Sequence, residues 1–446
     1  MAYVGLGSLS PELLHEILVL VRPSDLRVLP RVCRALNNFI RGNQALFRAM
    51  YLNLLDKPPT MKLDWEEEMK TYIRLQHVCS LRDVDAKKSA LPFVYNAVER
   101  LLKNASSTGE VAPCTTTHAA SRNVMALKRL FSDEINQTAF MQRSHLFQRV
   151  RAGRLLVKFE DKLREDHQQS AKLHCLHGSP LRKSSRISLR RINHWRAHPY
   201  ACSKVYDTRE HTRNTKWGPF RDDESGKVDW EKVEAILVVL FFNMRDNCAM
   251  SQSFNEAWSN PFSGAWSGSY LSTLPPEPDS LAARDPYGIT GIWYRVVCFL
   301  DYHDFFSFNF PVNDGLPRDT PRPPLHVGDE TRLIVMKLWV TSMEPPGPED
   351  GQDLPVVHFA GTSQALDDSW TEHNAPDTEP EGRVDARGTV RLSKEGEVRW
   401  TITSIFDGQE RWRSECVQVG GVRSARGVVG NWFARYAAIK GAVSYP

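Results

Sequence analysis

The chain has 446 residues, of which 41% are hydrophobic and 25% are charged, and this composition excludes an intrinsically disordered protein. The 57 basic residues are nearly balanced by 53 acidic ones, so the net charge of +4 gives no strong reason to expect a nucleic acid or a membrane as partner. Because one hydrophobic core stops growing at roughly 250–300 residues, the length predicts two or three domains.

The eight cysteines are scattered along the chain without a Cys-x-x-Cys pair. This spacing favours reduced thiols in the cytosol or the nucleus over a disulfide framework. The apolar stretch near the start carries Glu12 and Glu16 and has no basic leader, so it is a poor signal peptide. Because the longest apolar run, residues 235–242, is much shorter than the ~20 residues that span a bilayer, we expect an intracellular protein in the cytoplasm, the nucleus or both.

Residues 9–55 predict three short helices. Ser10 is a good N-cap for the first helix, Pro11 suits its first position, and Glu12 favours the positive end of its dipole. A polar Pro-Ser-Asp turn ends this helix and caps a second helix, whose apolar face runs from Leu26 to Phe39, and a Gly-Asn pair separates the second helix from the third. A module of this size cannot bury so many apolar side chains, which predicts a surface that binds a partner.

This module resembles the F-box. Residues 9–40 read LSPELLHEILVLVRPSDLRVLPRVCRALNNFI, with the family's Pro-Glu opening, Leu- and Ile-rich first helix, polar turn and second apolar helix. They depart from the family at Ser10, where a Leu often precedes the proline, and at 36–38, where a Trp is common. The resemblance implies a Skp-type adaptor and, through it, a cullin-RING ubiquitin ligase as partners; the alternative is an ordinary helical bundle. The residues assigned to adaptor binding are Leu9, Pro11, Glu12, Leu13, Ile17, Leu18, Leu29, Val32, Cys33 and Leu36.

The rest of the chain is expected to form three further regions after an F-box domain at 1–56. They are a helical linker at 57–165, a basic, irregular connecting region at 166–284, and an antiparallel β-barrel-like recognition domain at 285–446. Apolar periodicity predicts the linker helices, which are placed at 65–75, 91–102 and 124–150.

The connecting region contains a basic segment at 172–204, with eight basic side chains and several serines. No acidic residue lies between His167 and Tyr206. Such a segment can act as a nuclear-import signal, a nucleic-acid patch or a solvated loop. We favour the solvated loop, because blocks of like charge are usually surface tails.

The last region has runs rich in Val, Trp, Phe, Tyr, Ile and Thr between Gly, Pro and Asp residues, and these are strand signals. Asp407-Gly408 is the strongest turn signal, because both residues tolerate the positive φ of a tight hairpin. The strand before it places Trp400 on a core face with Val398 and Ile402. Eight strands are predicted, at 289–300, 304–310, 331–342, 355–360, 387–393, 397–405, 410–419 and 427–433. They predict an antiparallel barrel, just wide enough for side chains or one small ligand, and hence an α+β fold.

Residues 287–293, YGITGIW, resemble the Gly-x-Trp opening strand of lipocalin-like barrels. Two Pro-rich stretches predict loops at the barrel ends, at 311–324 and 344–355. Most of the chain also resembles a family of uncharacterised fungal F-box-domain proteins, through the first module and the segments at 200–207, 217–236, 286–310 and 388–433. Residues 434–446 depart from that family, because they lack its acidic and Gly/Pro-rich continuation.

Three groups suggest chemistry, and each has a simpler interpretation. The His-Cys-Leu-His run at 174–177 offers metal ligands, but structural zinc needs four and no second pair has suitable spacing. The Asp-Tyr-His-Asp run at 301–304 has no nucleophile motif nearby and fits a turn or a strand edge. The Gly-rich segment at 420–427 lacks the Gly-Lys-Ser/Thr ending of a phosphate loop and fits a barrel connection. We therefore predict no catalytic residue, metal or cofactor.

The 420–427 segment still offers a binding site. Arg423 and Arg426 can each make bidentate hydrogen bonds to a carboxylate or phosphate at the open end of the barrel. Trp400, Trp412 and Trp432 would supply aromatic walls for the bound substrate. The alternative interpretation places the tryptophans in the core and the arginines in surface ion pairs.

These patterns predict a substrate-receptor subunit of a Skp-cullin-F-box ubiquitin ligase with no active site of its own. It would hold an unknown protein target near a ubiquitin-conjugating enzyme, so that rate enhancement comes from proximity. Two alternatives stay open: a small-ligand-binding barrel linked to an F-box, and a nucleic-acid-associated protein that uses the basic segment. We expect no membrane partner.

Overall fold

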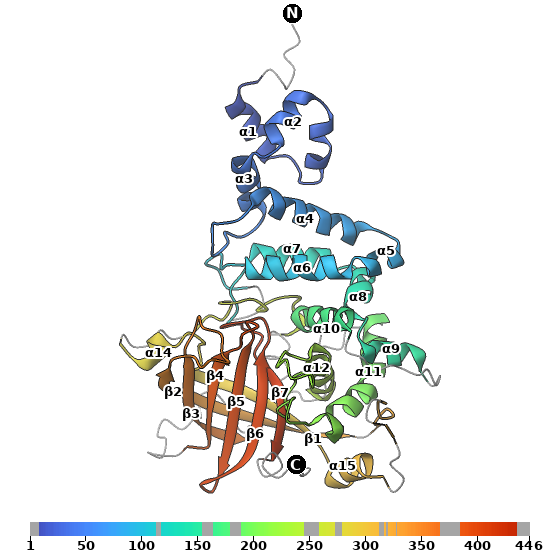
Figure 1. The fold of residues 1–446 in the computed structure, drawn as a ribbon, viewed down its shortest axis with the longest axis vertical. Helices are drawn as coiled ribbons and strands as arrows, with labels where there is room; N and C mark the ends of the chain where they lie inside the picture. The colour runs from blue at the N-terminus through green and yellow to red at the C-terminus, as the bar shows by residue number, and fades with distance from the viewer. Residues whose placement is uncertain are drawn as a thin grey trace, which may run out of the picture. The chain divides into compact units, whose positions relative to one another are not determined.

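The computed structural model describes residues 9–112, 117–153, 164–178, 189–244, 258–272, 279–311, 316–317, 320–326, 328–365 and 384–434. The chain forms two compact units. Unit 1 contains residues 1–110 and 119–140, and unit 2 contains residues 111–118 and 141–446. Unit 1 is helical, whereas unit 2 combines helices with a seven-stranded antiparallel sheet (Figure 1). The predicted α+β fold, with helices first and a barrel-like sheet last, is confirmed.

The N-terminal helices of unit 1 begin with the predicted cap. The Ser10 hydroxyl accepts a hydrogen bond from the Leu13 amide at 3.4 Å, and Pro11 takes the first helical position. The predicted second helix is wrong in its first half, where two 3-10 turns replace it. Pro30 cannot donate a backbone hydrogen bond and disfavours a helical residue before it, which explains the break. The observed elements are α1 (Pro11–Val19), η2 (Asp25–Arg27), η3 (Leu29–Arg31), α2 (Arg34–Ile40) and α3 (Gln44–Leu54).

Longer helices follow in the linker region. The helices predicted at 65–75 and 91–102 are confirmed, but the continuous helix predicted at 124–150 is wrong because three separate helices span it. The polar side chains of Ser132 and Asp133 bond to nearby backbone groups and end the first of these. The helices are α4 (Trp65–Ser80), α5 (Val84–Ser89), α6 (Leu91–Lys103), α7 (Arg122–Leu130), α8 (Glu134–Met141) and α9 (His145–Ala152).

A buried carboxylate joins the N-terminal helices of unit 1 to α7. Asp56 is buried and accepts hydrogen bonds from the Ser121 hydroxyl at 2.5 Å and from the Arg122 amide at 2.8 Å. The amide of Ser106 also donates to it, at 3.2 Å. An acceptor at a helix N-terminus satisfies amides that lack partners within the helix. Asp56 therefore fixes the end of the first helical module against the helices that follow it in unit 1.

The sheet of unit 2 runs in chain order from one edge strand to the other, with every pair antiparallel. Its strands are β1 (Gly291–Leu300), β2 (Asp329–Glu344), β3 (Val356–Ala365), β4 (Ala386–Leu392), β5 (Val398–Phe406), β6 (Gln409–Gln418) and β7 (Val428–Ala434). Seven of the eight predicted strands are confirmed. The strand predicted at 304–310 is wrong, because these residues belong to helix α15 (Tyr302–Asn309), whose N-cap Asp301 accepts from the His303 amide at 2.8 Å.

The predicted hairpin and core face are also observed. Asp407 and Gly408 have φ of 51° and 73° and form the turn between β5 and β6. Trp400 is almost fully buried, and its ring lies 5.1 Å from that of Trp293 and 5.6 Å from that of Phe359. Inward-facing side chains of successive strands thus form the core of the barrel-like sheet.

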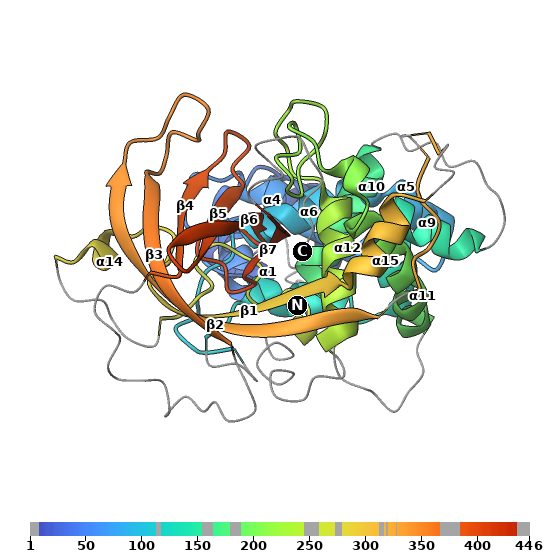
Figure 2. The same ribbon diagram turned by 90° about the horizontal axis from the view of Figure 1, so that it is seen from below.

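Helices complete unit 2, including the stretch predicted to be irregular. They are α10 (Glu165–His177), α11 (Leu189–Val205), η4 (Thr208–Glu210), α12 (Trp230–Met244) and α14 (Leu281–Arg284), with α9 and α15. The strand order leaves β1 and β7 as edges that do not pair with each other among the described residues. Apolar helix α12 packs against both, so it covers the opening of a nearly closed barrel (Figure 2). No described helix is long and apolar enough to cross a membrane.

Candidate functional site

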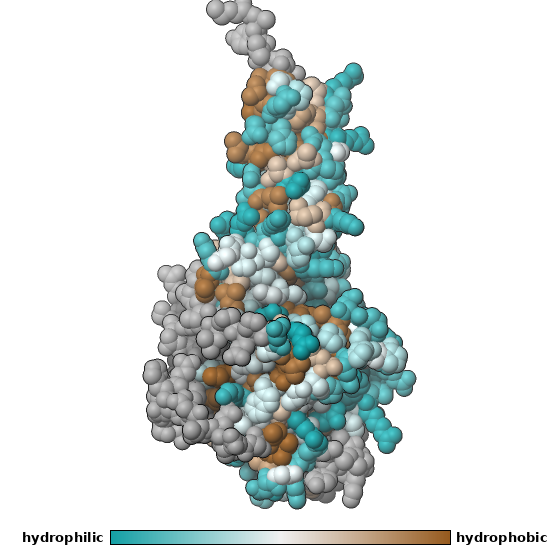
Figure 3. Space-filling view, turned by 90° about the vertical axis from the view of Figure 1, so that its left-hand side faces the viewer, coloured by the Kyte–Doolittle hydropathy of each residue, from teal (hydrophilic) through white to brown (hydrophobic). Residues whose placement is uncertain are grey.

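The first candidate site is an apolar surface on the N-terminal helices of unit 1. Leu14, Leu18 and Leu36 are buried in the module, while other apolar side chains of the same helices and turns are exposed. Hydrophobic groups gather over these helices in the space-filling view (Figure 3). The exposed apolar residues are Leu13, Ile17, Leu20, Val28 and Val32. Clustered exposed apolar groups of this kind typically mark an interaction site.

The structure separates the ten residues assigned to adaptor binding into three groups. Exposed are Pro11, Glu12, Leu13, Ile17, Val32 and Cys33, and half-buried are Leu9 and Leu29. The assignment of Leu18 and Leu36 to a binding surface is wrong, because both are core residues, with Leu18 only 1% exposed. Apolar residues occur all around α1, so its spacing alone does not show which face is buried. The sequence analysis also missed two exposed apolar residues that follow α1, Leu20 and Val28.

The second candidate site was the 420–427 segment, which is the connection from β6 to β7, as expected. Its backbone is fastened to residues 264–270: Gly268 donates to the Val422 carbonyl at 2.9 Å, and Tyr270 donates to the Arg423 carbonyl at 3.0 Å. Gly420 and Gly421 have positive φ, which favours glycine. The segment is therefore a rigid part of unit 2.

The two arginines of this connection have different roles. Arg423 is exposed, whereas Arg426 is only 1% exposed and its Nη2 donates to the backbone carbonyls of Leu176, His177 and Asn260 at 2.9–3.1 Å. Its guanidinium also lies 5.0 Å from the ring centroid of Trp258. Burial lowers the pKa of Arg426 to about 9. The prediction that Arg426 reaches a ligand at an open barrel end is therefore wrong, because its hydrogen-bond donors hold the chain's own backbone.

The three predicted tryptophans lie on the inner face of the sheet. Trp400 belongs to the core, and its indole donates to the Gln418 side chain at 3.2 Å. Trp412 and Trp432, on adjacent strands, are partly exposed and stack with ring centroids 4.1 Å apart. All three line one pocket, whereas Arg423 is not among its lining residues.

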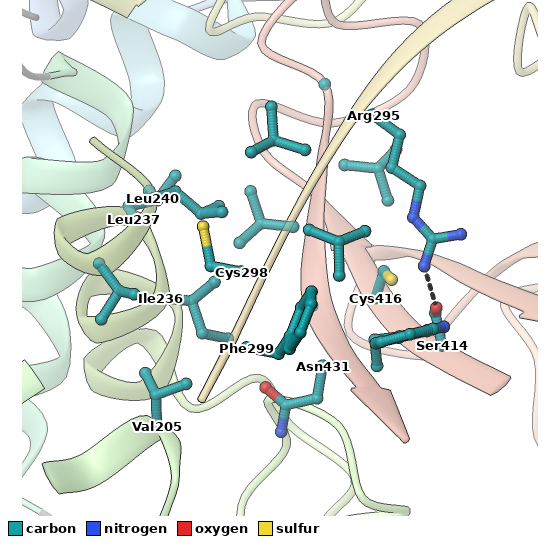
Figure 4. A pocket seen from close by; sticks show the side chains of 18 of the residues that line it. Val205, Ile236, Leu237, Leu240, Arg295, Cys298, Phe299, Ser414, Cys416 and Asn431 are labelled. Atoms are coloured by element: carbon teal, nitrogen blue, oxygen red, sulfur yellow. Dashed lines mark hydrogen bonds between the residues drawn. The ribbon is translucent and has the colours of Figure 1, made fainter. Parts of the chain in front are cut away.

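This pocket lies in unit 2 between α12 and the inner face of the sheet and has a volume of about 270 Å³. Ile236, Leu237 and Leu240 of α12 face the strands across it, and Phe299 projects from β1 (Figure 4). Most of the lining is apolar. A concave apolar pocket with a few polar groups is the usual form of a small-molecule site.

One charged side chain of the pocket was missed by the sequence analysis. Arg295 of β1 lies on the same strand face as Trp293 and Val297, and its Nη2 donates to the Ser414 hydroxyl at 2.8 Å (Figure 4). Burial lowers the pKa of Arg295, but a guanidinium keeps its charge in proteins. The alternation of β1 gives a signal for this residue, because it places an arginine among apolar side chains that face the core.

The basic segment at 172–204 is not a solvated loop where the structure describes it. Lys172 lies on α10 and pairs with Glu397 at 3.1 Å, and Lys204 lies on α11, 3.5 Å from Glu210 and 3.7 Å from Asp229. These lysines are mostly buried and are neutralised by carboxylates outside the 172–204 segment, so the composition of the segment alone could not reveal the pairing. Residues 179–188, with Arg182, Lys183 and Arg186, lie outside the described residues.

The His-Cys-Leu-His run at 174–177 lies on α10, and its side chains have different partners. His174 Nδ1 is 2.6 Å from Glu234 Oε1, whereas His177 Nδ1 is 2.9 Å from the Gly178 carbonyl. Burial raises the pKa of the Cys175 thiol well above its ordinary value. Within the described part of the chain, no three His, Cys, Asp or Glu side chains are grouped as metal ligands.

Two buried carboxyl groups of α12 predict a pH-dependent stability. Burial raises the pKa of both Glu231 and Glu234 to about 8, against the opposing effects of Lys204 and of hydrogen bonds from His145 and Ser144. When the chain unfolds, these groups return to the ordinary value of 4.5. Between these values the folded state holds more protons than the unfolded state, so stability falls as pH rises.

We therefore expect the free energy of unfolding to decrease with pH above the ordinary histidine pKa of 6.5 and up to about pH 8. Each group contributes a slope of up to about 1.4 kcal/mol per pH unit. Glu234→Gln, which keeps the side-chain shape but cannot ionise, should make the slope shallower by about that amount. Urea unfolding of both proteins at several pH values measures this. The pKa of His145 is lowered from 6.5 to about 3, so the titration of this group affects the free energy of unfolding only below pH 6.5. Equal slopes in the two proteins would contradict the assignment.

An aromatic row on α15 was also missed, because a strand was predicted there. Tyr302, Phe306 and Phe310 recur every four residues and are exposed. The ring centroid of Phe306 lies 6.0 Å from that of Tyr302 and 5.1 Å from that of Phe310. The Asp301 cap and this spacing are helix signals that could have identified the row. The exposed rings offer contact area of the kind that is enriched at protein interfaces.

Comparison with known domain families matches residues 6–47 to the F-box domain. No curated protein and no solved structure matches the chain. The matched segment contains the exposed apolar surface of α1 and the turns that follow it. F-box domains generally bind Skp-type adaptors in cullin-RING ligases. Residues 6–47 are therefore an F-box domain, which supports an F-box protein.

Proposed function

We propose that this chain is the substrate-receptor subunit of a Skp-cullin-F-box ubiquitin ligase. The observation that carries the proposal is the set of exposed apolar side chains on the F-box domain, among them Leu13, Ile17 and Val32. Leaving these groups in water is unfavourable, and covering them with an adaptor surface stabilises a complex. The adaptor would connect the chain to the cullin-RING assembly.

In this proposal unit 2 binds the target protein. Its aromatic row on α15, Tyr302, Phe306 and Phe310, supplies rigid apolar contact area for a protein surface. The chain has no catalytic role of its own, and it accelerates ubiquitin transfer by holding the target near the conjugating enzyme.

The protein is also proposed to come from a fungus and to act in the cytoplasm or the nucleus. The resemblance to uncharacterised fungal F-box-domain proteins suggests a fungal protein, and a role in ubiquitin transfer requires the cytoplasm or the nucleus. No disulfide joins the six cysteines that the structure describes, among them Cys79 and Cys175, which supports a reducing compartment.

The test is ubiquitin transfer in a reconstituted system. The full chain is combined with a Skp-type adaptor, a cullin-RING assembly and a charged conjugating enzyme, and proteins that co-purify with the chain serve as acceptors. Ubiquitin conjugates should form on a retained protein when the chain is present and disappear when it is omitted. An assembled complex that conjugates none of the retained proteins would contradict the receptor function.

A further inference from the structure

Arg295 is a charged group inside an apolar pocket. It projects from the inner face of β1, beside Trp293, and its only hydrogen-bond partner among the described residues is the neutral hydroxyl of Ser414, at 2.8 Å. Arg295 is half-buried, and a charge that is partly removed from water is stabilised by an opposite charge or by hydrogen bonds. A guanidinium has five N–H donors, so most of the donors of Arg295 have no protein acceptor in the pocket.

No carboxylate of the described residues neutralises Arg295. The acidic residue next to Ser414 in sequence, Glu415, lies on the other face of β6, where it accepts hydrogen bonds from Arg413 at 2.8 Å and Thr401 at 3.1 Å. The Cys416 thiol is nearer, but burial raises its pKa to about 12, so it is neutral at physiological pH. A second arginine, Arg426, also lines the pocket, but its Nη2 donates to backbone carbonyls. Arg295 is thus a lining guanidinium that no described carboxylate neutralises.

The rest of the pocket suits an apolar chain. Its volume is about 270 Å³. Because a water molecule occupies roughly 30 Å³, and a methylene group is of similar size, the pocket holds about nine such groups. Ile236, Leu237 and Leu240 form one wall, and Phe299 projects from β1 (Figure 4). Trp432 also lines the pocket, with its ring centroid 6.5 Å from that of Phe299. An apolar wall beside the unneutralised guanidinium of Arg295 defines a site for an amphiphilic anion.

We propose that this pocket binds a small amphiphilic monocarboxylate, whose carboxylate pairs with the Arg295 guanidinium while its apolar chain lies along α12. The Ser414 oxygen accepts from Arg295, so its hydroxyl hydrogen is available to donate to the same carboxylate. A carboxylate matches the guanidinium in a bidentate pair. This inference concerns unit 2 alone and does not depend on adaptor binding.

The experiment titrates the full chain with octanoate, using octylamine and octanol as ligands with the same apolar chain but a positive or a neutral head group. Calorimetry should show saturable binding of one octanoate, weaker binding of octanol and no binding of octylamine. Absence of octanoate binding, or equal binding of octanoate and octanol, would overturn the proposal. This comparison uses the unaltered protein, so it holds even if a pocket variant fails to fold.

A pair of matched variants tests the role of the charge. Arg295→Met keeps the apolar stem of the side chain and removes its donors, and it should weaken octanoate binding by about ten- to a hundredfold while leaving octanol binding unchanged. Arg423→Met makes the same substitution at an exposed arginine of unit 2 that does not line the pocket, and it should bind octanoate as the unaltered chain does. Equal octanoate affinity of Arg295→Met and the unaltered chain would show that Arg295 does not hold the ligand.

Discussion

Arg426→Met is expected to lower the free energy of unfolding of unit 2 by about 3–5 kcal/mol. The substitution keeps a long apolar stem but removes the donors that bind the carbonyls of Leu176, His177 and Asn260. These carbonyls come from two segments far from Arg426 in the sequence, and a buried carbonyl without a donor is costly. Urea unfolding of the full chain, followed by tryptophan fluorescence, measures the effect.

Arg423→Met is the matched control, because Arg423 lies in the same connection but is exposed. Its unfolding free energy should differ from that of the unaltered chain by less than about 0.5 kcal/mol. If Arg426→Met were as stable as this control, Arg426 would not be the residue that fastens the β6–β7 connection to α10, and its three hydrogen bonds would contribute little to the fold.

Ile17→Asp is expected to abolish co-purification of a Skp-type adaptor with the full chain. Ile17 is 41% exposed on α1, so the substitution places a charge in the centre of the proposed apolar interface without disturbing the core. Truncating a central apolar contact commonly costs more than about 2 kcal/mol of binding, and burying an unpaired carboxylate adds to this cost. The expected loss of affinity is more than about a hundredfold.

Two further variants separate binding from folding. An aspartate near the end of a helix is unfavourable by itself, whereas a lysine there suits the helix dipole, so Ile17→Lys should lose the adaptor equally if the effect is interfacial. Met125→Asp alters a residue of α7 in the same unit that is 43% exposed but lies outside the F-box domain. It should bind the adaptor normally. Loss of the adaptor in Met125→Asp as well would indicate a general effect on unit 1.

Features with a local cause were predictable from the sequence. The Ser10 cap and the Asp407-Gly408 hairpin depend on residues within a few positions of each other, and both are observed. The strands follow from alternating side chains, which also placed Trp400 in the core. The prediction of a continuous second helix was wrong for a local reason, because Pro30 interrupts the helix.

Features that depend on distant contacts were not predictable. Arg423 and Arg426 are the same residue type in the same short connection. Arg423 is exposed and Arg426 is buried only because of how residues 260–270 and α10 pack against that connection. Leu18 and Ile17 are equally apolar, and their roles differ because α1 packs on α3 by one face. Arg295 could be found from the alternation of β1, but its pocket exists only because α12 packs against both edge strands.

The most direct test of the central claim is a calorimetric titration of the purified full chain with a purified Skp-type adaptor from the same source. We predict saturable binding of one adaptor with a Kd below about 1 µM, and no detectable heat with Ile17→Asp. Absence of binding by the unaltered, folded chain, or equal binding by Ile17→Asp, would contradict the account.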